Sequence, residues 1–195
     1  MPWGKRAATD AGNQNGLGMI TEYEFTLKFK LAAAEASAES LVEQLGEAGC
    51  DDALVGVGQP GRIELDFTRE AKSASEALLS AIKDVRRAIP DAQLIEASPD
   101  YVGLTDVAEM LGVSRQNMRK LMASHLDFPS PVHEGSSQIW HLEPVLQWMS
   151  GRVGSHRIER RLLEIAQVTM QVNLTKELKQ LEPAQQERFR KWVAA

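Results

Sequence analysis

The helix expected after Ser114 carries cationic and amide side chains and no acidic residue up to Ser124. With Met118 facing inward, a step of about 100° per residue decides which side chains face outward or flank that side. The resulting candidate contact residues are Ser114, Arg115, Gln116, Asn117, Arg119 and Lys120. Arginine pairs with guanine edges, and glutamine or asparagine pairs with adenine. The pattern therefore predicts contacts to bases and phosphates in the major groove of DNA.

The residues before this helix have the features of a tight turn between two helices. Thr105 is expected to cap the first helix, and Gly112 to end it with a positive φ. Ala108 allows the helices to cross closely, Val113 fills the angle between them, and Ser114 caps the second helix. This combination closely resembles the bacterial helix-turn-helix, which implies that the second helix enters the major groove.

A hairpin is expected next, in PVHEGSSQIWHL, followed by a helix in EPVLQWM. Residues 102–150 resemble the winged-helix DNA-binding domains of excisionase-like and MerR-type regulators. The resemblance implies that the hairpin contacts double-stranded DNA through Ser136, Ser137 and Gln138. Such wings often carry Arg or Lys, and this one does not. Arginines beyond the wing are expected to supply the missing positive charge, and a solvated helix start is the alternative interpretation of them. They are Arg152, Arg157, Arg160 and Arg161.

The histidines and tryptophans of this segment are expected to serve structure. His133 and His141 would make wing contacts pH-dependent if they took part, but solvated or hydrogen-bonded side chains are the favoured interpretation. Their spacing fits no ordinary zinc pattern. Trp140 and Trp148 are expected to pack in a core.

No catalytic motif stands out. The sequence has no P-loop, dinucleotide fingerprint or Ser-His-Asp arrangement. The single cysteine, Cys50, has the acidic neighbours Asp51 and Asp52, which should raise its thiol pKa. We therefore predict no enzyme activity, no cofactor and no metal site. A single cysteine, no secretory signal and no membrane-spanning run predict a cytoplasmic protein.

Residues 20–98 predict a ferredoxin-like sandwich within an α+β protein. The stretch YEFTLKFKL alternates apolar and polar residues, as a half-buried strand does. A helix with Leu41, Val42 and Leu45 facing inward follows. Then come a hairpin with a Gly-Gln-Pro-Gly turn, a second amphipathic helix and a short strand. The order β-α-β-β-α-β is the split βαβ arrangement of this fold.

The net charge of -5 is unevenly distributed. Residues 20–100 carry 8 Lys and Arg against 16 Asp and Glu, whereas residues 101–157 are neutral and residues 158–195 carry a net +2. The acidic part must face away from any bound DNA, because negative charge close to phosphates opposes binding. The roles that remain open for this acidic part are dimerisation, binding of a small ligand and contact with a protein partner.

The chain is expected to divide into four segments, with Ser98–Asp100 as a linker. These are a flexible arm, a ferredoxin-like dimerisation or sensing domain, a winged helix-turn-helix domain and a helical oligomerisation segment, at 1–19, 20–98, 101–150 and 151–195. A long helix in the last segment has a wide apolar stripe. Pairing of this stripe with a second copy is preferred, and packing within the chain is the alternative.

The favoured function is a sequence-specific DNA-binding transcriptional regulator that works as a homodimer. One short helix and a weakly charged wing make few phosphate contacts, and a second copy would double them. The main alternative is an assembly or adaptor module that uses the helix-turn-helix to bind protein. An RNA reader is disfavoured, because the strand GRIELDF presents Glu64 and Asp66, rather than aromatics, on its open face.

Overall fold

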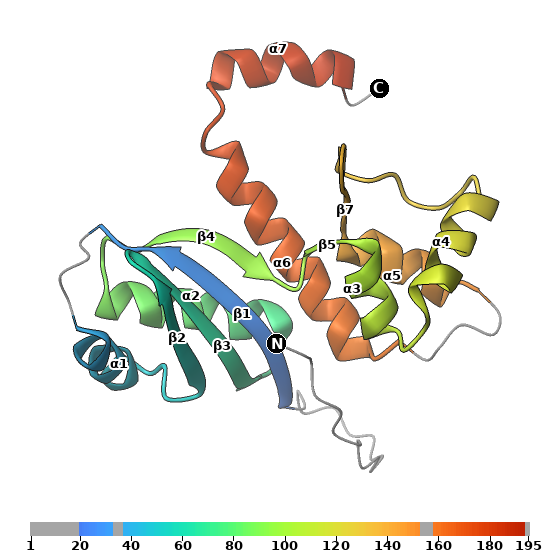
Figure 1. The fold of residues 1–195 in the computed structure, drawn as a ribbon. Coiled ribbons are helices and arrows are strands. Elements are labelled where there is room, and N and C mark those ends of the chain that lie inside the picture. The colour runs from blue at the N-terminus through green and yellow to red at the C-terminus, as the bar shows by residue number, and fades with distance from the viewer. Residues whose placement is uncertain (1–19, 33–36, 153–157, 194–195) are drawn as a thin grey trace.

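The computed structural model describes residues 20–32, 37–152 and 158–193, which form a mixed α+β fold (Figure 1). The N-terminal elements are β1 (Thr21–Lys30), α1 (Ala38–Glu47), β2 (Ala53–Gln59), β3 (Arg62–Ala71), α2 (Ala74–Ala88) and β4 (Gln93–Ser98). A smaller unit follows, with β5 (Tyr101–Val102), α3 (Leu104–Met110), α4 (Arg115–Ser124), β6 (His133–Glu134), β7 (Gln138–His141) and α5 (Leu142–Ser150). Two further helices are α6 (Arg160–Leu178) and α7 (Pro183–Val193).

The N-terminal elements form an antiparallel sheet with the strand order β2-β3-β1-β4. The alternation predicted for β1 is confirmed, because Tyr23, Phe25, Leu27 and Phe29 are all buried. They pack with alternate residues of β3 and with α1 and α2. The other side of β3 exposes charged residues, as expected from GRIELDF. The prediction for Val42 is wrong, because this α1 residue is 47% exposed.

A buried arginine, Arg69, joins three elements of the N-terminal unit. Its guanidinium donates two hydrogen bonds to the Asp52 carboxylate, at 2.7 and 2.8 Å, and one to Asp84, at 2.8 Å. It also donates to Ser80 Oγ at 3.0 Å and to the Gly49 carbonyl at 2.7 Å. These bonds connect β3 to α2 and to the turn before β2. Because the guanidinium is hydrogen-bonded to two carboxylates, a hydroxyl and a carbonyl, its positive charge can be buried here.

Replacement of Arg69 by methionine should destabilise the fold by about 3–5 kcal/mol, because it leaves the Asp52 carboxylate without its partner and Asp84 with only the exposed Arg87, at 3.3 Å. Urea unfolding followed by circular dichroism measures this change. Arg86→Met is the matched control, since Arg86 is exposed on α2. A loss below about 1 kcal/mol for Arg69→Met would show that this network does not stabilise the fold.

The environment of Cys50 fits the expectation of a high thiol pKa. The side chain is 2% exposed, and burial, the largest cause, together with the nearby carboxylate of Asp84 raises its pKa from 9.0 to about 11. The thiol form is thus favoured by folding. The associated stability is fully present below pH 9 and is lost as the pH rises through about 11.

We expect native Cys50 to react with a thiol reagent such as DTNB at pH 8 far more slowly than the urea-unfolded chain does. Between pH 8 and pH 11 the native protein should lose about 2–3 kcal/mol of stability relative to a Cys50→Ala variant measured in parallel. Equal pH dependence of the two proteins would contradict the shift.

The smaller unit surrounds its own core. Strands β5, β7 and β6 form a three-stranded sheet, in which Tyr101 pairs with His141 and His133 pairs with Ile139. The hairpin of β6 and β7 was predicted, whereas β5 was not, since two residues are too short for a pattern. Buried residues of α3, α4, α5 and β7 pack together beneath it.

Helix α6 contacts both cores. Ile165 is buried in the N-terminal core, and Ala166 is buried in the core of the smaller unit. The chain itself therefore covers most of the apolar stripe that was predicted to pair with a second copy. Packing within the chain, which was the alternative, is what the structure shows. The predicted linker Ser98–Asp100 is likewise a joint against α6, in which Pro99 and Asp100 are buried.

Helix α7 begins at Pro183, as predicted, and none of its described residues is buried. Its large apolar residues are exposed, namely Phe189, Trp192 and Val193. The end of α6 and the residues after it expose Leu174, Leu178 and Leu181. Across the described ranges, no helix has the length and apolar character needed to span a bilayer.

Candidate nucleic-acid interface

The turn between α3 and α4 has the geometry expected from its residues. Gly112 has φ +63°, a left-handed conformation that favours glycine. The Val113 amide donates to the Ala108 carbonyl at 2.9 Å, and Ser114 Oγ accepts from the Asn117 amide at 3.1 Å. The prediction that Thr105 caps α3 is wrong. The helix starts two residues earlier than that requires, with Gly103 as its cap.

The start of α3 is stabilised by an acidic side chain instead of a hydroxyl. The Asp106 carboxylate accepts from the Gly103 amide at 2.7 Å and also lies in the first turn, where negative charge interacts favourably with the helix dipole. Asp106 thus stabilises the start of α3 in place of Thr105, because the register of the helix determines which residue forms the cap.

The inner side of α4 is anchored by one residue. Met118 is 0% exposed and packs in the core with Val107, Ala108 and Leu111 of α3 and the turn. Leu121 and Met122 pack partly buried against the same core. Since Met118 faces inward, the rotation of α4 that the sequence analysis assumed is confirmed.

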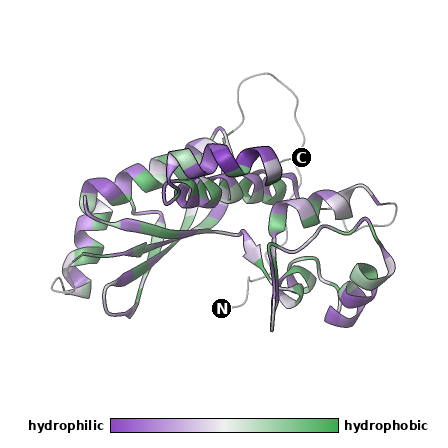
Figure 2. Cartoon of the chain, turned by 90° about the horizontal axis from the view of Figure 1, so that it is seen from above, coloured by the Kyte–Doolittle hydropathy of each residue, from purple (hydrophilic) through white to green (hydrophobic). Residues whose placement is uncertain are grey.

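The outer side of α4 is open to solvent. Every candidate contact residue on this helix and at its cap is exposed: Ser114, Arg115, Gln116, Asn117, Arg119 and Lys120. Among the described residues, none forms an ion pair with Arg115, Arg119 or Lys120. Figure 2 shows α4 at the end of the molecule away from the large sheet, with strongly hydrophilic residues along it. We call this set the α4 surface.

The hairpin of β6 and β7 contributes polar groups without a cation. Ser136 and Ser137 are exposed at its tip, so they are available for contacts. Gln138 is half-buried, and its amide donates to Glu134 Oε1 at 3.0 Å. The predicted wing residues therefore divide into two free serines and one glutamine that braces the hairpin.

The arginines expected to add charge lie in different places. Arg152 is held within the unit, because its guanidinium donates to Asp127 Oδ2 at 2.7 Å and stacks 3.7 Å from the centroid of the Trp148 ring. Arg157 lies outside the described residues. Arg160 and Arg161 pair with Glu164 and Glu159, at 2.7 and 2.6 Å. None of the three described arginines is a free cation beside the wing.

An aromatic cluster supports the segment after α4. Phe128 packs edge-on against Trp148, with centroids 4.9 Å apart, and against Trp140 at 6.2 Å. Trp140 Nε1 donates to the Pro129 carbonyl at 3.0 Å, and Trp148 Nε1 donates to Asp127 Oδ2 at 3.1 Å. The tryptophans are core residues, as predicted. They hold in place the segment that connects α4 to the hairpin.

A buried polar network joins the two units beside this interface. Asp100 accepts from Asn173 Nδ2 at 2.7 Å, and its other oxygen lies 2.7 Å from His141 Nδ1. Asn173 also exchanges two hydrogen bonds with the backbone of Ala97, and Thr169 Oγ1 donates to the Pro99 carbonyl at 2.7 Å. Burial raises the pKa of the Asp100 carboxyl, and its two hydrogen-bond partners act against that rise.

This network was not predicted from the sequence, in which His141 was considered as a wing residue. His141 instead ends β7 at the joint, where it is oriented by Asp100. A usable signal was present in the sequence. Thr169 and Asn173 are four residues apart on the otherwise apolar side of α6, and polar residues on a buried helix face require partners.

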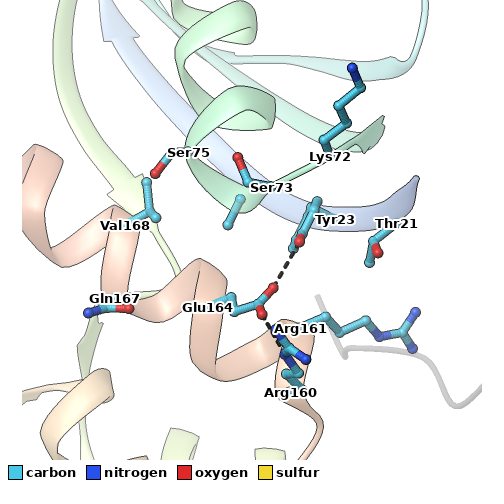
Figure 3. Close-up of a pocket in the computed structure, with 11 residues that line it drawn as sticks. Thr21, Tyr23, Lys72, Ser73, Ser75, Arg160, Arg161, Glu164, Gln167 and Val168 are labelled. Carbon is cyan, nitrogen blue, oxygen red and sulfur yellow. Dashed lines mark hydrogen bonds and ion pairs between the residues drawn. The ribbon is translucent and has the colours of Figure 1, made fainter. Parts of the chain in front are cut away.

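A hollow lies where α6 meets β1 and α2, with a volume of about 590 Å³ (Figure 3). At its centre Glu164 accepts from the Tyr23 hydroxyl at 2.8 Å and from Arg160 at 2.7 Å. Lys72 and Arg161 extend away from Glu164. The charged groups at the centre of the hollow thus pair with one another, and the hollow is part of the packing between α6 and the sheet.

No protein family, curated protein or solved structure matches this chain. Within the described part of the chain, no group of three or more His, Cys, Asp or Glu residues is placed to hold a metal ion. The candidate interface must therefore be judged from its own geometry.

Replacement of Asn173 by alanine should destabilise the protein on the order of 3 kcal/mol, because it removes one partner from Asp100 and two from the Ala97 backbone. Urea unfolding measures the loss. Asn117→Ala is the matched control, since that side chain is exposed on α4. Similar stabilities of the two variants would contradict a structural role for this network.

Proposed function

We propose that residues 101–150 form a winged helix-turn-helix that binds double-stranded DNA in a sequence-specific manner, with α4 in the major groove. The observation that carries this proposal is the α4 surface, where three cations and two amides face solvent without an acidic residue on the helix. An exposed helix that only needed solubility would mix charges of both signs. Guanidinium and amide groups are the donors and acceptors that read base edges.

The position of the acidic unit is compatible with DNA binding. In Figures 1 and 2, α4 and α1 lie at opposite ends of the molecule, so most of the negative charge is remote from the α4 surface. Charges further apart than about 8–10 Å are largely screened at physiological salt. The strand order β2-β3-β1-β4 with two helices on one face supports a ferredoxin-like sandwich for this unit.

We further propose that the protein binds DNA as a homodimer through its C-terminal segment. Helix α7 has no buried residue among those described, and an isolated helix of 11 residues is marginal in water. Its first half carries Glu187 and follows Glu182, whereas its second half carries Arg188, Arg190 and Lys191. Antiparallel pairing with a second α7 would bring opposite charges together and cover Phe189 and Trp192.

A protein-binding role for the helix-turn-helix is the alternative. Leu126, two residues after the end of α4, is fully exposed, and Val132 is 49% exposed. Apolar side chains beside the α4 surface would suit a protein contact, and the wing without a cation offers little to phosphates. Salt dependence separates the two functions, because DNA affinity should fall steeply between about 50 and 200 mM salt.

Selection of bound sequences from random duplex DNA tests the main proposal. We expect enrichment of a symmetric consensus with two half-sites, each contacted by one α4. Absence of any enriched sequence at low salt would reject sequence-specific binding, and an asymmetric single site would reject the homodimer.

On the selected site, Arg119→Ala should weaken binding by about 5- to 150-fold and relax discrimination at one position, because a base contact contributes about 1–3 kcal/mol. Lys120→Ala should weaken binding to all sequences and reduce the salt slope by about one. Fluorescence anisotropy at several salt concentrations measures both effects. The control is Lys83→Ala, an exposed cation on α2. Equal effects of all three changes would favour unspecific electrostatics.

A further inference from the structure

The two edges of the large sheet differ. At the β4 edge, side chains of α6 bind the backbone. Asn173 accepts from the Ala97 amide and donates to the Ala97 carbonyl, and Lys176 Nζ donates to the Ile95 carbonyl. At the other edge, β2 pairs with β3 on one side only, and no further strand of the described ranges pairs with its free side. The free backbone groups of β2 can therefore accept another strand.

Strand β2 has one of the features that protect such an edge, a register irregularity between Gly56 and Gln59, and lacks the others. Exposed edge strands commonly carry lysine or proline, or are very short. The seven residues of β2, ALVGVGQ, include no charged residue and no proline. Leu54 is 72% exposed on one side of the strand and Val57 is 46% exposed. An apolar free edge of this length is a site for strand addition.

A groove runs beside this edge. It has a volume of about 580 Å³ and lies between α1 and β2, and its apolar lining consists of Ala38, Val42, Val55 and Val57. The exposure of Val42, which the helix pattern had placed in the core, results from this groove. Alternate side chains of an added strand would point towards it, because successive residues of a strand face opposite sides.

The charges around the groove select the partner. Glu39 and Glu43 line it, and α1 has no cation. A second copy that paired through β2 would bring two such acidic helices towards each other, which opposes self-association. A strand whose groove-facing side carries lysine or arginine together with apolar residues would place its cations near the carboxylates and its apolar side chains against the valines.

We propose that the β2 edge and the α1 groove bind an extended peptide segment of a partner protein that carries both apolar and basic residues on the side facing the groove. The segment adds to the sheet beside β2. Its apolar side chains contact Val42, Val55 and Val57, and its cations lie near Glu39 and Glu43. The site is at the opposite end of the molecule from α4 and does not depend on DNA binding (Figure 1).

The test uses the full chain and a capped, fluorescein-labelled peptide of Val-Ser-Lys-Ser repeats, which places valine and lysine on the same side of an extended strand. We expect saturable binding by fluorescence anisotropy, and slower amide hydrogen exchange in residues 53–59 when the peptide is bound. The double variant Glu39→Lys/Glu43→Lys should weaken binding by about tenfold, since surface ion pairs contribute up to about 1 kcal/mol each. The same peptide with glutamate in place of lysine should not bind.

Two controls separate this site from general attraction to an acidic protein. Glu47→Lys lies on α1 outside the groove lining, and Glu64→Lys lies on the open face of the sheet. Each should change the affinity by less than about twofold. Equal losses in all variants, absence of saturable binding, or protection confined to other strands would overturn the proposal. Protection of residues 53–59 in a peptide-free dimer would do so too, because a second copy would then occupy the edge.

Discussion

The structure depends most on the buried contact between α6 and the residues that connect the two units. Asn173 satisfies both backbone groups of Ala97 and one oxygen of Asp100, while Thr169 binds the next carbonyl along the chain. A buried carboxylate and buried backbone groups without partners would each be unfavourable. Because α6 satisfies all of them, the connection between the units is part of a core and not a loose linker. The described residues contain no buried side-chain nitrogen or oxygen without a partner.

This joint has a consequence for charge. The N-terminal unit is strongly acidic, and the smaller unit is neutral with its free cations gathered on α4. A flexible linker would let the acidic unit approach the α4 surface or any polyanion bound there. With α6 packed against both cores, the two charge distributions keep their separation. Arg152, in contrast, does not add to the cationic surface, because its stacking on Trp148 removes one cation from those available to phosphates.

The same helix makes the sheet asymmetric. By covering β4, α6 protects one edge with side-chain hydrogen bonds and leaves β2 at the other. Two surfaces with different chemistry result, a cationic one on α4 and an apolar, acid-rimmed one beside β2. Their separation would allow both to be occupied at once, so that a protein partner could be brought to the DNA that we propose α4 binds. The exposed α7 is a third surface, suited to a second copy.

The sequence alone determined the local elements and the orientation of α4. Alternation in β1, the glycine that requires a positive φ at 112 and the hydroxyl cap at Ser114 are properties of neighbouring residues, so they could be predicted together with the burial of Met118. Tertiary structure decided what covers each face. A stripe on α6 looks the same whether its partner is a second copy or its own chain, and a short Ser-Pro-Asp stretch resembles a linker until a distant Asn173 binds it. The Arg69 network and the exposure of Val42 likewise follow from residues far apart in the sequence, whose approach only the packing of the whole chain defines.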